Sequence, residues 1–153
     1  MLFKIQILFL FLLTLHLNSA PFTDNGDGTV KDNATGLVWQ KCSIGQTYTN
    51  STCSGAATTE LAGNAIYYCG LSSLASRGWR MPNMNEIRSI VDYSKSTSPM
   101  IDTAVFPNTV SGIYWSSTTP QTLGTRCYIS FITGLVQCTF TGLSYYYRCV
   151  SGP

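Results

Sequence analysis

The stretch GWRMPNMNEIRSIVD, residues 78–92, is the most decisive for the fold because it fixes where a helix begins. Asn83 follows a proline and precedes Glu86 by three residues, which is the spacing of a capping box, and the apolar residues that follow recur on one helical face. A glutamate in a first helical turn normally stabilises the cap and the helix dipole, so Glu86 needs no catalytic explanation. Gly78 ends the preceding element, and Trp79–Met81 predicts a short extended segment.

The chain on either side of this stretch predicts a helix before it and strands after it. Ala57–Ala75 lacks proline and carries apolar residues at helical spacing, with Cys69 facing the core. Asp92–Gly112 has about 21 residues, a length that indicates a functional loop, such as a ligand loop, or a disordered one. Four strands separated by glycine-containing turns follow, at Ile113–Thr118, Arg126–Phe131, Leu135–Phe140 and Tyr145–Val150. The tryptophans are expected in the core, namely Trp39, Trp79 and Trp115.

The stretch DNGDGTVKDNATG, residues 24–36, is rich in aspartate, asparagine and glycine, as calcium loops are. With Gly28 at the sixth position of an EF-hand loop, Thr23 falls first and Ala34 twelfth, so the entry ligand and the closing glutamate are both missing. The residues instead predict two tight turns and an N-terminal β-hairpin. A looser structural calcium site stays open as an alternative, with carboxylates from Asp24, Asp27 and Asp32, or from Asp92 and Asp102.

The first residues have the order of a secretory signal peptide: Lys4, the apolar run Ile5–Leu17, then Asn18-Ser19-Ala20. We expect residues 1–20 to be cleaved after Ala20, with an uncleaved anchor as the alternative, and residues 21–153 to form one domain without a membrane span. The expected location is the extracellular medium or the cell surface, with the periplasm as an alternative. The formal net charge of +2 and the absence of a basic run argue against nucleic acid as a partner.

The chain has six cysteines, all after the predicted signal peptide, which indicates three disulfides. No pair has CxxC spacing, and the single histidine, His16, lies in the signal peptide, so zinc is not favoured. In a hairpin with a two-residue turn at Ile132-Thr133, residues that face each other have numbers that sum to 265. The numbers of Cys127 and Cys138 have this sum, so the hairpin predicts a cross-strand disulfide between them. A local disulfide between Cys42 and Cys53 leaves Cys69 for Cys149.

Strand alternation around these cysteines separates a buried face from a candidate ligand-binding surface. The buried face is expected to hold Cys127, Ile129, Phe131, Val136, Cys138 and Phe140, with Tyr145 and Tyr147 on the buried parity of the last strand. The candidate ligand-binding residues are polar or aromatic and alternate with the cysteines: Arg126, Tyr128, Ser130, Gln137, Thr139, Tyr146 and Arg148. An ordinary solvated sheet face is the alternative interpretation.

Five blocks in order resemble successive motifs of the domain family named after the C-terminal domain of the Legionella collagen-like protein. These blocks are FTDNGDGTVKDNATGLVWQKC, GWRMPNMNEIRSIVDYS, IDTAVFPNT, YWSSTT and YYYRCV, and they cover the chain from Phe22 to Val150. The resemblance implies an α+β, C-type lectin-like fold: two helices packed on a twisted antiparallel sheet whose first and last strands meet. It also implies a secreted or surface adhesin linked with glycosaminoglycan-type polysaccharides and trimeric assembly.

Against this background we expect a non-catalytic domain without a cofactor that binds an extracellular glycan. The sequence lacks the Glu-Pro-Asn, Gln-Pro-Asp and Trp-Asn-Asp triplets by which calcium-dependent lectins of this fold hold sugars, and it has no collagen-like repeat. Its small net charge gives little attraction for sulfated glycans. The first alternative is a structural or assembly module of a surface appendage with protein partners. A remote alternative is a relative of the sulfatase-activating oxidases of this fold, which need an unpaired cysteine at Cys127 or Cys138.

Overall fold

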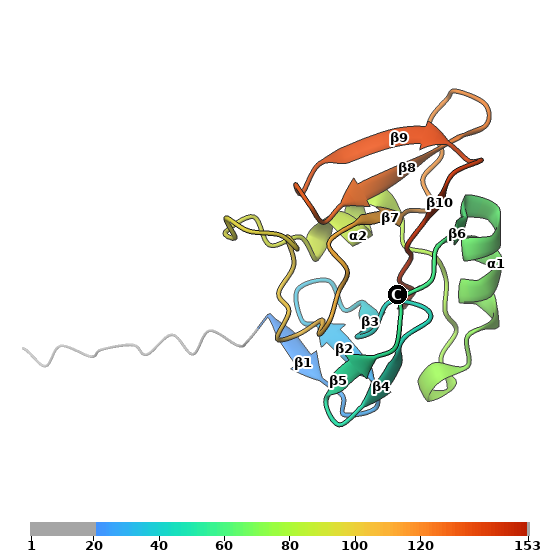
Figure 1. Ribbon diagram of the computed structural model, residues 1–153. Helices are drawn as coiled ribbons and strands as arrows, with labels where there is room; N and C mark the ends of the chain where they lie inside the picture. The colour runs from blue at the N-terminus through green and yellow to red at the C-terminus, as the bar shows by residue number, and fades with distance from the viewer. Residues whose placement is uncertain (1–20, 153) are drawn as a thin grey trace, which may run out of the picture.

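The computed structural model describes residues 21–152 as a mixed α+β domain built mostly from short antiparallel strands (Figure 1). Within this range the α-helices are α1 (Ala62–Leu71) and α2 (Met84–Ser89), and a 3-10 turn spans Leu74–Ser76. The strands are β1 (Phe22–Asp24), β2 (Thr29–Asp32), β3 (Val38–Gln40), β4 (Thr47–Thr49), β5 (Thr52–Ser54), β6 (Glu60–Leu61), β7 (Ile113–Trp115), β8 (Thr125–Ser130), β9 (Val136–Phe140), β10 (Ser144–Tyr145) and β11 (Val150–Ser151). The predicted signal peptide, residues 1–20, lies outside the described residues.

Helix α2 begins where the capping box predicts. The Asn83 side chain accepts a hydrogen bond of 3.0 Å from the backbone N–H of Glu86, and the Glu86 carboxylate accepts one of 2.7 Å from the backbone N–H of Asn83. Both terminal nitrogens of Arg80 also donate to the Glu86 carboxylate, at 2.7 and 2.6 Å. Glu86 therefore has the structural role that its position predicts.

A four-stranded sheet brings the two ends of the described chain together. Its order is β1-β2-β3-β11, and each neighbouring pair is antiparallel. The predicted N-terminal hairpin is confirmed as β2 and β3, where Val30 lies opposite Trp39, and Val150 of β11 lies on the other side of Trp39. Trp39 is fully buried at the centre of this sheet.

Aspartate side chains make the turns of residues 24–36. Each accepts a hydrogen bond from the backbone N–H two residues ahead: Asp24 from Gly26, Asp27 from Thr29 and Asp32 from Ala34. This is the geometry of an Asx turn, which explains why aspartate recurs in the stretch. The prediction of tight turns is confirmed.

Strands β7, β8 and β9 form a separate antiparallel sheet, at the top of Figure 1, with β9 at its edge. Opposed residues of β8 and β9 follow the predicted register, and Cys127 lies opposite Cys138 with their Cα atoms 3.9 Å apart. The predicted disulfide between them is confirmed.

The predicted buried face is right for β8 and wrong for β9. Cys127, Ile129 and Phe131 are buried, whereas Val136 is 38% and Phe140 71% exposed. Alternation decides the side to which a residue points, but burial also needs a covering element. Strand β9 is the edge strand, and the side chains of Val136 and Phe140 therefore remain in contact with solvent.

The other two predicted disulfides are also confirmed. Cys42–Cys53 closes the polar loop that carries β4 and leads into β5, and Cys69–Cys149 joins α1 to the segment before β11. Cys69 faces the core, as predicted, but α1 is shorter than Ala57–Ala75 because Glu60 and Leu61 form β6 and pair with β10. Neither helix of residues 21–152 has the length and apolar character needed to cross a bilayer.

Two clusters of buried side chains form the core. The first joins the N-terminal sheet to α2 and β8 through residues such as Trp39, Ile87 and Ile129, and the second packs α1 against Trp79 and Trp115. All three tryptophans are buried, as predicted. Each cluster draws on segments far apart in sequence, so the core depends on long-range packing.

The long segment between α2 and β7 is packed rather than loose. Ile101 and Phe106 are fully buried, and the Phe106 ring meets that of Phe22 edge-on at 5.5 Å between centroids. The backbone N–H of Met100 donates to the carbonyl of Phe131 at 2.7 Å. The alternative that this segment is disordered is therefore wrong.

The ion pair at the start of α2 predicts a specific acid dependence. Hydrogen bonds from Arg80 hold the pKa of the Glu86 carboxyl below its ordinary value of 4.5. A carboxyl with a lowered folded pKa stabilises the fold above its unfolded pKa, and this contribution is lost as pH falls through the folded pKa. Glu86→Gln, which keeps a capping acceptor, should therefore flatten the fall in unfolding free energy below about pH 4.5, as measured by urea titration at several pH values. Parallel pH profiles for the two proteins would contradict this role.

Candidate functional site

Arg148 is fully buried, so the prediction that it faces the ligand-binding surface is wrong. One terminal nitrogen donates to the backbone carbonyls of Gln40, at 2.8 Å, and of Lys41. The other donates to the hydroxyls of Ser43, at 3.2 Å, and Thr109, at 2.7 Å. Burial lowers the pKa of Arg148 to about 10, which leaves the guanidinium charged at neutral pH. Arg148 is therefore a structural residue.

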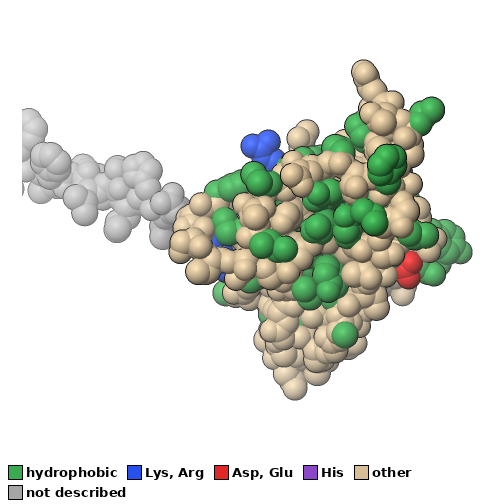
Figure 2. Space-filling model, turned by 45° about the horizontal axis from the view of Figure 1, so that its top comes forward, with side chains coloured by type: hydrophobic (Ala, Val, Ile, Leu, Met, Phe, Trp, Pro, Cys, Tyr) green, Lys and Arg blue, Asp and Glu red, His purple; other side chains and the backbone are tan. Residues whose placement is uncertain are grey.

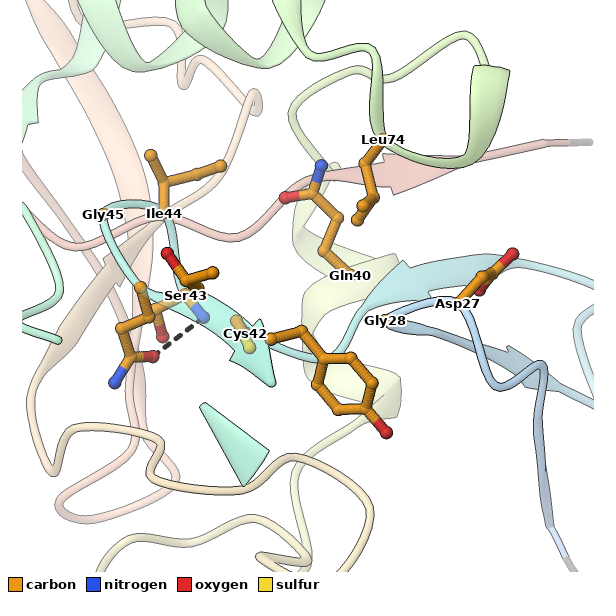
Figure 3. A pocket seen from close by; sticks show the side chains of 11 residues that line it. Asp27, Gly28, Gln40, Cys42, Ser43, Ile44, Gly45 and Leu74 are labelled. Atoms are coloured by element: carbon orange, nitrogen blue, oxygen red, sulfur yellow. Dashed lines mark hydrogen bonds between the residues drawn. The ribbon is translucent and has the colours of Figure 1, made fainter. Parts of the chain in front are cut away.

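The bonds of Arg148 fix one wall of a cavity of about 280 Å³ (Figure 3). Gln40 and Ser43, which Arg148 holds, line this cavity together with Asp27, Tyr48 and residues of the Cys42–Cys53 loop. Leu74, in the 3-10 turn after α1, also lines the cavity, and in Figure 3 its side chain lies beside the amide of Gln40.

Gln40 offers an open acceptor in this cavity. Its side chain is buried, with a residue exposure of 4%, and its Nε2 donates to the Ser72 hydroxyl at 2.8 Å. Its Oε1 has no hydrogen-bond partner among the described residues, and it is not sealed from solvent. A buried amide normally satisfies both ends, so this oxygen is available to a ligand donor.

Asp27 and Tyr48 complete the polar rim. The Asp27 carboxylate uses Oδ1 for its turn, at 2.5 Å from the Thr29 hydroxyl, while Oδ2 accepts no bond within residues 21–152. The Tyr48 hydroxyl accepts a hydrogen bond of 3.2 Å from Lys41 and keeps its own proton for a ligand acceptor. Gly28 has a φ of +84°, which favours glycine, and a Cβ there would lie 3.3 Å from the Tyr48 side chain. The absence of a side chain at position 28 therefore allows Tyr48 to pack against this turn.

A partly buried ion pair holds the tyrosine side of the cavity. Lys41 Nζ lies 2.6 Å from an Asp24 carboxylate oxygen and 4.9 Å from the centre of the Tyr48 ring. Burial lowers the pKa of Lys41, but hydrogen bonds to Asp24 and Tyr48 outweigh it and raise the pKa overall. The Lys41 ammonium group therefore interacts with Asp24 and Tyr48 and not with a ligand in the cavity.

Part of the predicted ligand-binding set does lie together on β8 and β9. Arg126 is opposite Thr139 and Tyr128 is opposite Gln137, and the Tyr128 hydroxyl donates to the Gln137 side chain at 2.5 Å. Tyr128 is nevertheless buried, because its ring packs edge-on against Trp115, and Ser130 is half-buried. Gln137 is the exposed member of the set.

Tyr146 does not join this set. It packs on Tyr114, with ring centroids 5.5 Å apart, in the other core cluster, whereas Tyr145 meets Tyr128 at 5.3 Å. The prediction extended strand alternation from Cys149 back to Tyr145. The alternation holds, because Tyr145, Tyr147 and Cys149 pack into one core cluster and Tyr146 into the other. Both sides of this segment are covered, so the side of Tyr146 is not a free surface.

The aspartates proposed for a calcium site do not form a cluster of three, and their carboxylates make other interactions. Asp24 pairs with Lys41, and Asp32 accepts the Thr35 hydroxyl at 2.7 Å besides its turn bonds. Asp92 and Asp102 do line one cavity, of about 290 Å³, next to Phe22. Within residues 21–152, no three His, Cys, Asp or Glu side chains are grouped closely enough to hold a metal ion.

Gln40 and Tyr48 are functional candidates that were not predicted from the sequence. The signal that was present is the loop closed by Cys42 and Cys53, in which Tyr48 is the aromatic residue among small and polar ones. Gln40 carries no signal in the sequence, because its open oxygen depends on where Ser72 and Leu74 lie.

All six cysteines are paired, so the unpaired Cys127 or Cys138 that an oxidase relative would need is not present. The comparison with protein families matches residues 28–151 to the Lcl C-terminal domain. The comparisons with curated proteins and with solved structures found no match.

Arg148→Met tests the structural role of the buried guanidinium. The substitution keeps much of the side-chain length but leaves two carbonyls and two hydroxyls without their donor, so it should lower the free energy of unfolding by about 3 kcal/mol. Arg126→Met is the matched control, because the half-buried Arg126 donates one hydrogen bond, to the Ser117 carbonyl at 2.6 Å, and should cost about 1 kcal/mol. Urea unfolding of the two variants measures both values, and equal losses would contradict the role.

Proposed function

The chain belongs to the family of the Lcl C-terminal domain, and from this premise we propose that it is a secreted, surface-associated binding domain without catalytic activity. We propose further that it acts as an adhesin-like domain and that its ligand is an extracellular glycan. The three disulfides support an oxidising location outside the cytoplasm.

A C-type lectin-like fold is part of this proposal. Three features support it: β11 joins the N-terminal sheet, two helices pack on sheets, and a disulfide ties α1 to the C-terminal segment. These are the features that the family resemblance implies for that fold.

The observation that carries the glycan proposal is the open Oε1 of the buried Gln40 at a cavity of about 280 Å³. A sugar presents adjacent hydroxyl groups that donate and accept, and apolar C–H faces that pack on rings. Gln40 and Asp27 supply acceptors, Tyr48 supplies a hydroxyl and a ring, and Leu74 supplies an apolar wall. The cavity is thus built for a small neutral polar group.

The charge at the cavity favours a neutral glycan over a sulfated one. Asp27 is the one charged residue that lines it, and the nearby Lys41 is bound to Asp24. A sulfate or carboxylate on the ligand would meet the Asp27 carboxylate as a like charge without a cationic partner. We therefore propose neutral glycans as the ligand class.

The alternative function is an assembly module that binds protein partners at a surface appendage. The exposed, uncharged strand β9 favours it, and its consequences are developed below. The two functions use different surfaces and do not exclude each other.

Glycan-array binding of the oxidised protein, presented multivalently because single sites bind weakly, tests the proposed ligand class. We expect selective binding of neutral glycans, and Gln40→Ala should weaken it about tenfold through loss of the acceptor. Asp27→Asn keeps the turn acceptor but removes the charge, so it should increase binding of sulfated glycans relative to neutral ones.

Gln137→Ala is the matched control, because it removes a glutamine from the other candidate surface, on β9. Its binding should stay within about twofold of the unmodified protein. Loss of binding in this variant alone would move the site to β8 and β9, and absence of binding to any glycan would overturn the proposal. Loss of binding on addition of a chelator would require a calcium ion at the site.

A further inference from the structure

Strand β9 is a sheet edge that pairs with no further strand of residues 21–152. It lies outermost in the three-stranded sheet, and Figure 1 shows it at the outer end of the domain, away from the N-terminal sheet. Four of its five residues are exposed, Phe140 most of all. Figure 2 shows hydrophobic side chains gathered on this end of the molecule with very few charged ones among them.

The backbone of β9 has hydrogen-bonding groups that the described chain does not use. The carbonyl of Leu135 accepts from Ser130 and the N–H of Thr141 donates to Gly124, so odd-numbered residues bond toward β8. In an antiparallel ladder these bonds alternate, and the backbone groups of even-numbered residues therefore point away from β8. Three N–H and three C=O groups are directed outward, those of Val136, Cys138 and Phe140.

Within residues 21–152, the edge has none of the features that normally prevent strand pairing. Proteins protect edges with lysine or other charges, with proline, with bulges or with a covering element. Strand β9 reads VQCTF, and from Thr103 to Pro153 the charged residues are Arg126 and the buried Arg148. Arg126 is directed to Ser117 on the far side of β8. The edge is thus neutral, partly apolar and open.

We infer that β9 pairs with β9 of a second copy of this chain, antiparallel and about a two-fold axis at Cys138. In this register Val136 lies opposite Phe140 of the second copy, and Gln137 lies opposite Thr139. The outward backbone groups of each copy then meet those of the other, and the two three-stranded sheets continue into one.

Self-complementarity favours a second copy over an unrelated peptide as the occupant. Apolar side chains face apolar ones on one side of the joined sheet, and polar side chains face polar ones on the other. Strand β9 carries no charged side chain, so the pairing brings no like charges of the two copies together. Cys138 is bonded to Cys127 within its own chain, so the contact is non-covalent.

Sedimentation of the oxidised protein over a range of concentrations tests the inference. We expect a reversible dimer, and hydrogen exchange should show the amides of Val136, Cys138 and Phe140 becoming protected as the dimer forms. A protein that stays monomeric at high micromolar concentration would overturn the inference. So would a trimer, or a dimer in which these amides exchange as in the monomer.

Charge substitutions identify the register. The double variant Val136→Lys/Phe140→Lys sets like charges opposite each other twice and should weaken dimerisation at least about tenfold. Val136→Glu/Phe140→Lys sets opposite charges across the same contacts and should restore it. Leu123→Lys, at a position that is 94% exposed and outside β9, is the control that should not change it. Equal weakening in both double variants would overturn the proposed register.

Discussion

The rest of the structure depends on the hydrogen bonds of the buried Arg148 guanidinium group. It is fully buried, and its partners are two carbonyls, two hydroxyls and the face of the Phe106 ring, 4.9 Å away, rather than a carboxylate. Its Nε has no partner among the described residues, so the four bonds of the terminal nitrogens and the Phe106 ring provide the compensation. A buried charge is tolerated only with such compensation, and this requirement fixes three segments relative to one another.

One of these segments, which contains Gln40 and Ser43, lines the candidate site. Arg148 holds the backbone of Gln40 while the side chain of Gln40 reaches the cavity, so the position of the ligand acceptor follows from the buried charge. The disulfide from Cys69 to the neighbouring Cys149 anchors the same C-terminal segment to α1, near the 3-10 turn that carries Leu74. The hydrogen bonds of the Arg148 guanidinium therefore hold the Gln40 side of the cavity, and the Cys69–Cys149 disulfide ties the Arg148 segment to α1.

The sequence predicts best what short-range chemistry decides. The capping box of Asn83 and Glu86 lies within one helical turn, and the opposition of Cys127 and Cys138 follows from one tight turn, so both are confirmed. The burial of Arg148 was missed because its acceptors come from Gln40, Ser43 and Thr109, far away in the sequence.

The exposure of β9 was missed for a related reason. Alternation assigned Phe140 to the side of Cys127 correctly, but it contains no information on whether another element covers that side. The same limit applies to the cavity, where Gln40, Tyr48 and Leu74 meet only through the tertiary fold. The side of a strand on which a residue lies and the residue that caps a helix can thus be predicted from this sequence. Which strand faces are covered, and where cavities form, can be known only from the structure.

Binding of a neutral glycan beside Gln40 is tested most directly by NMR titration of the isotopically labelled, oxidised protein with a neutral oligosaccharide. The side-chain amide resonances of Gln40 and the ring resonances of Tyr48 should shift together and saturate at a single dissociation constant, while the side-chain amide of Gln137 stays in place. Shifts confined to Gln137 and Tyr128, or no shifts at saturating ligand, would contradict a binding site at this cavity.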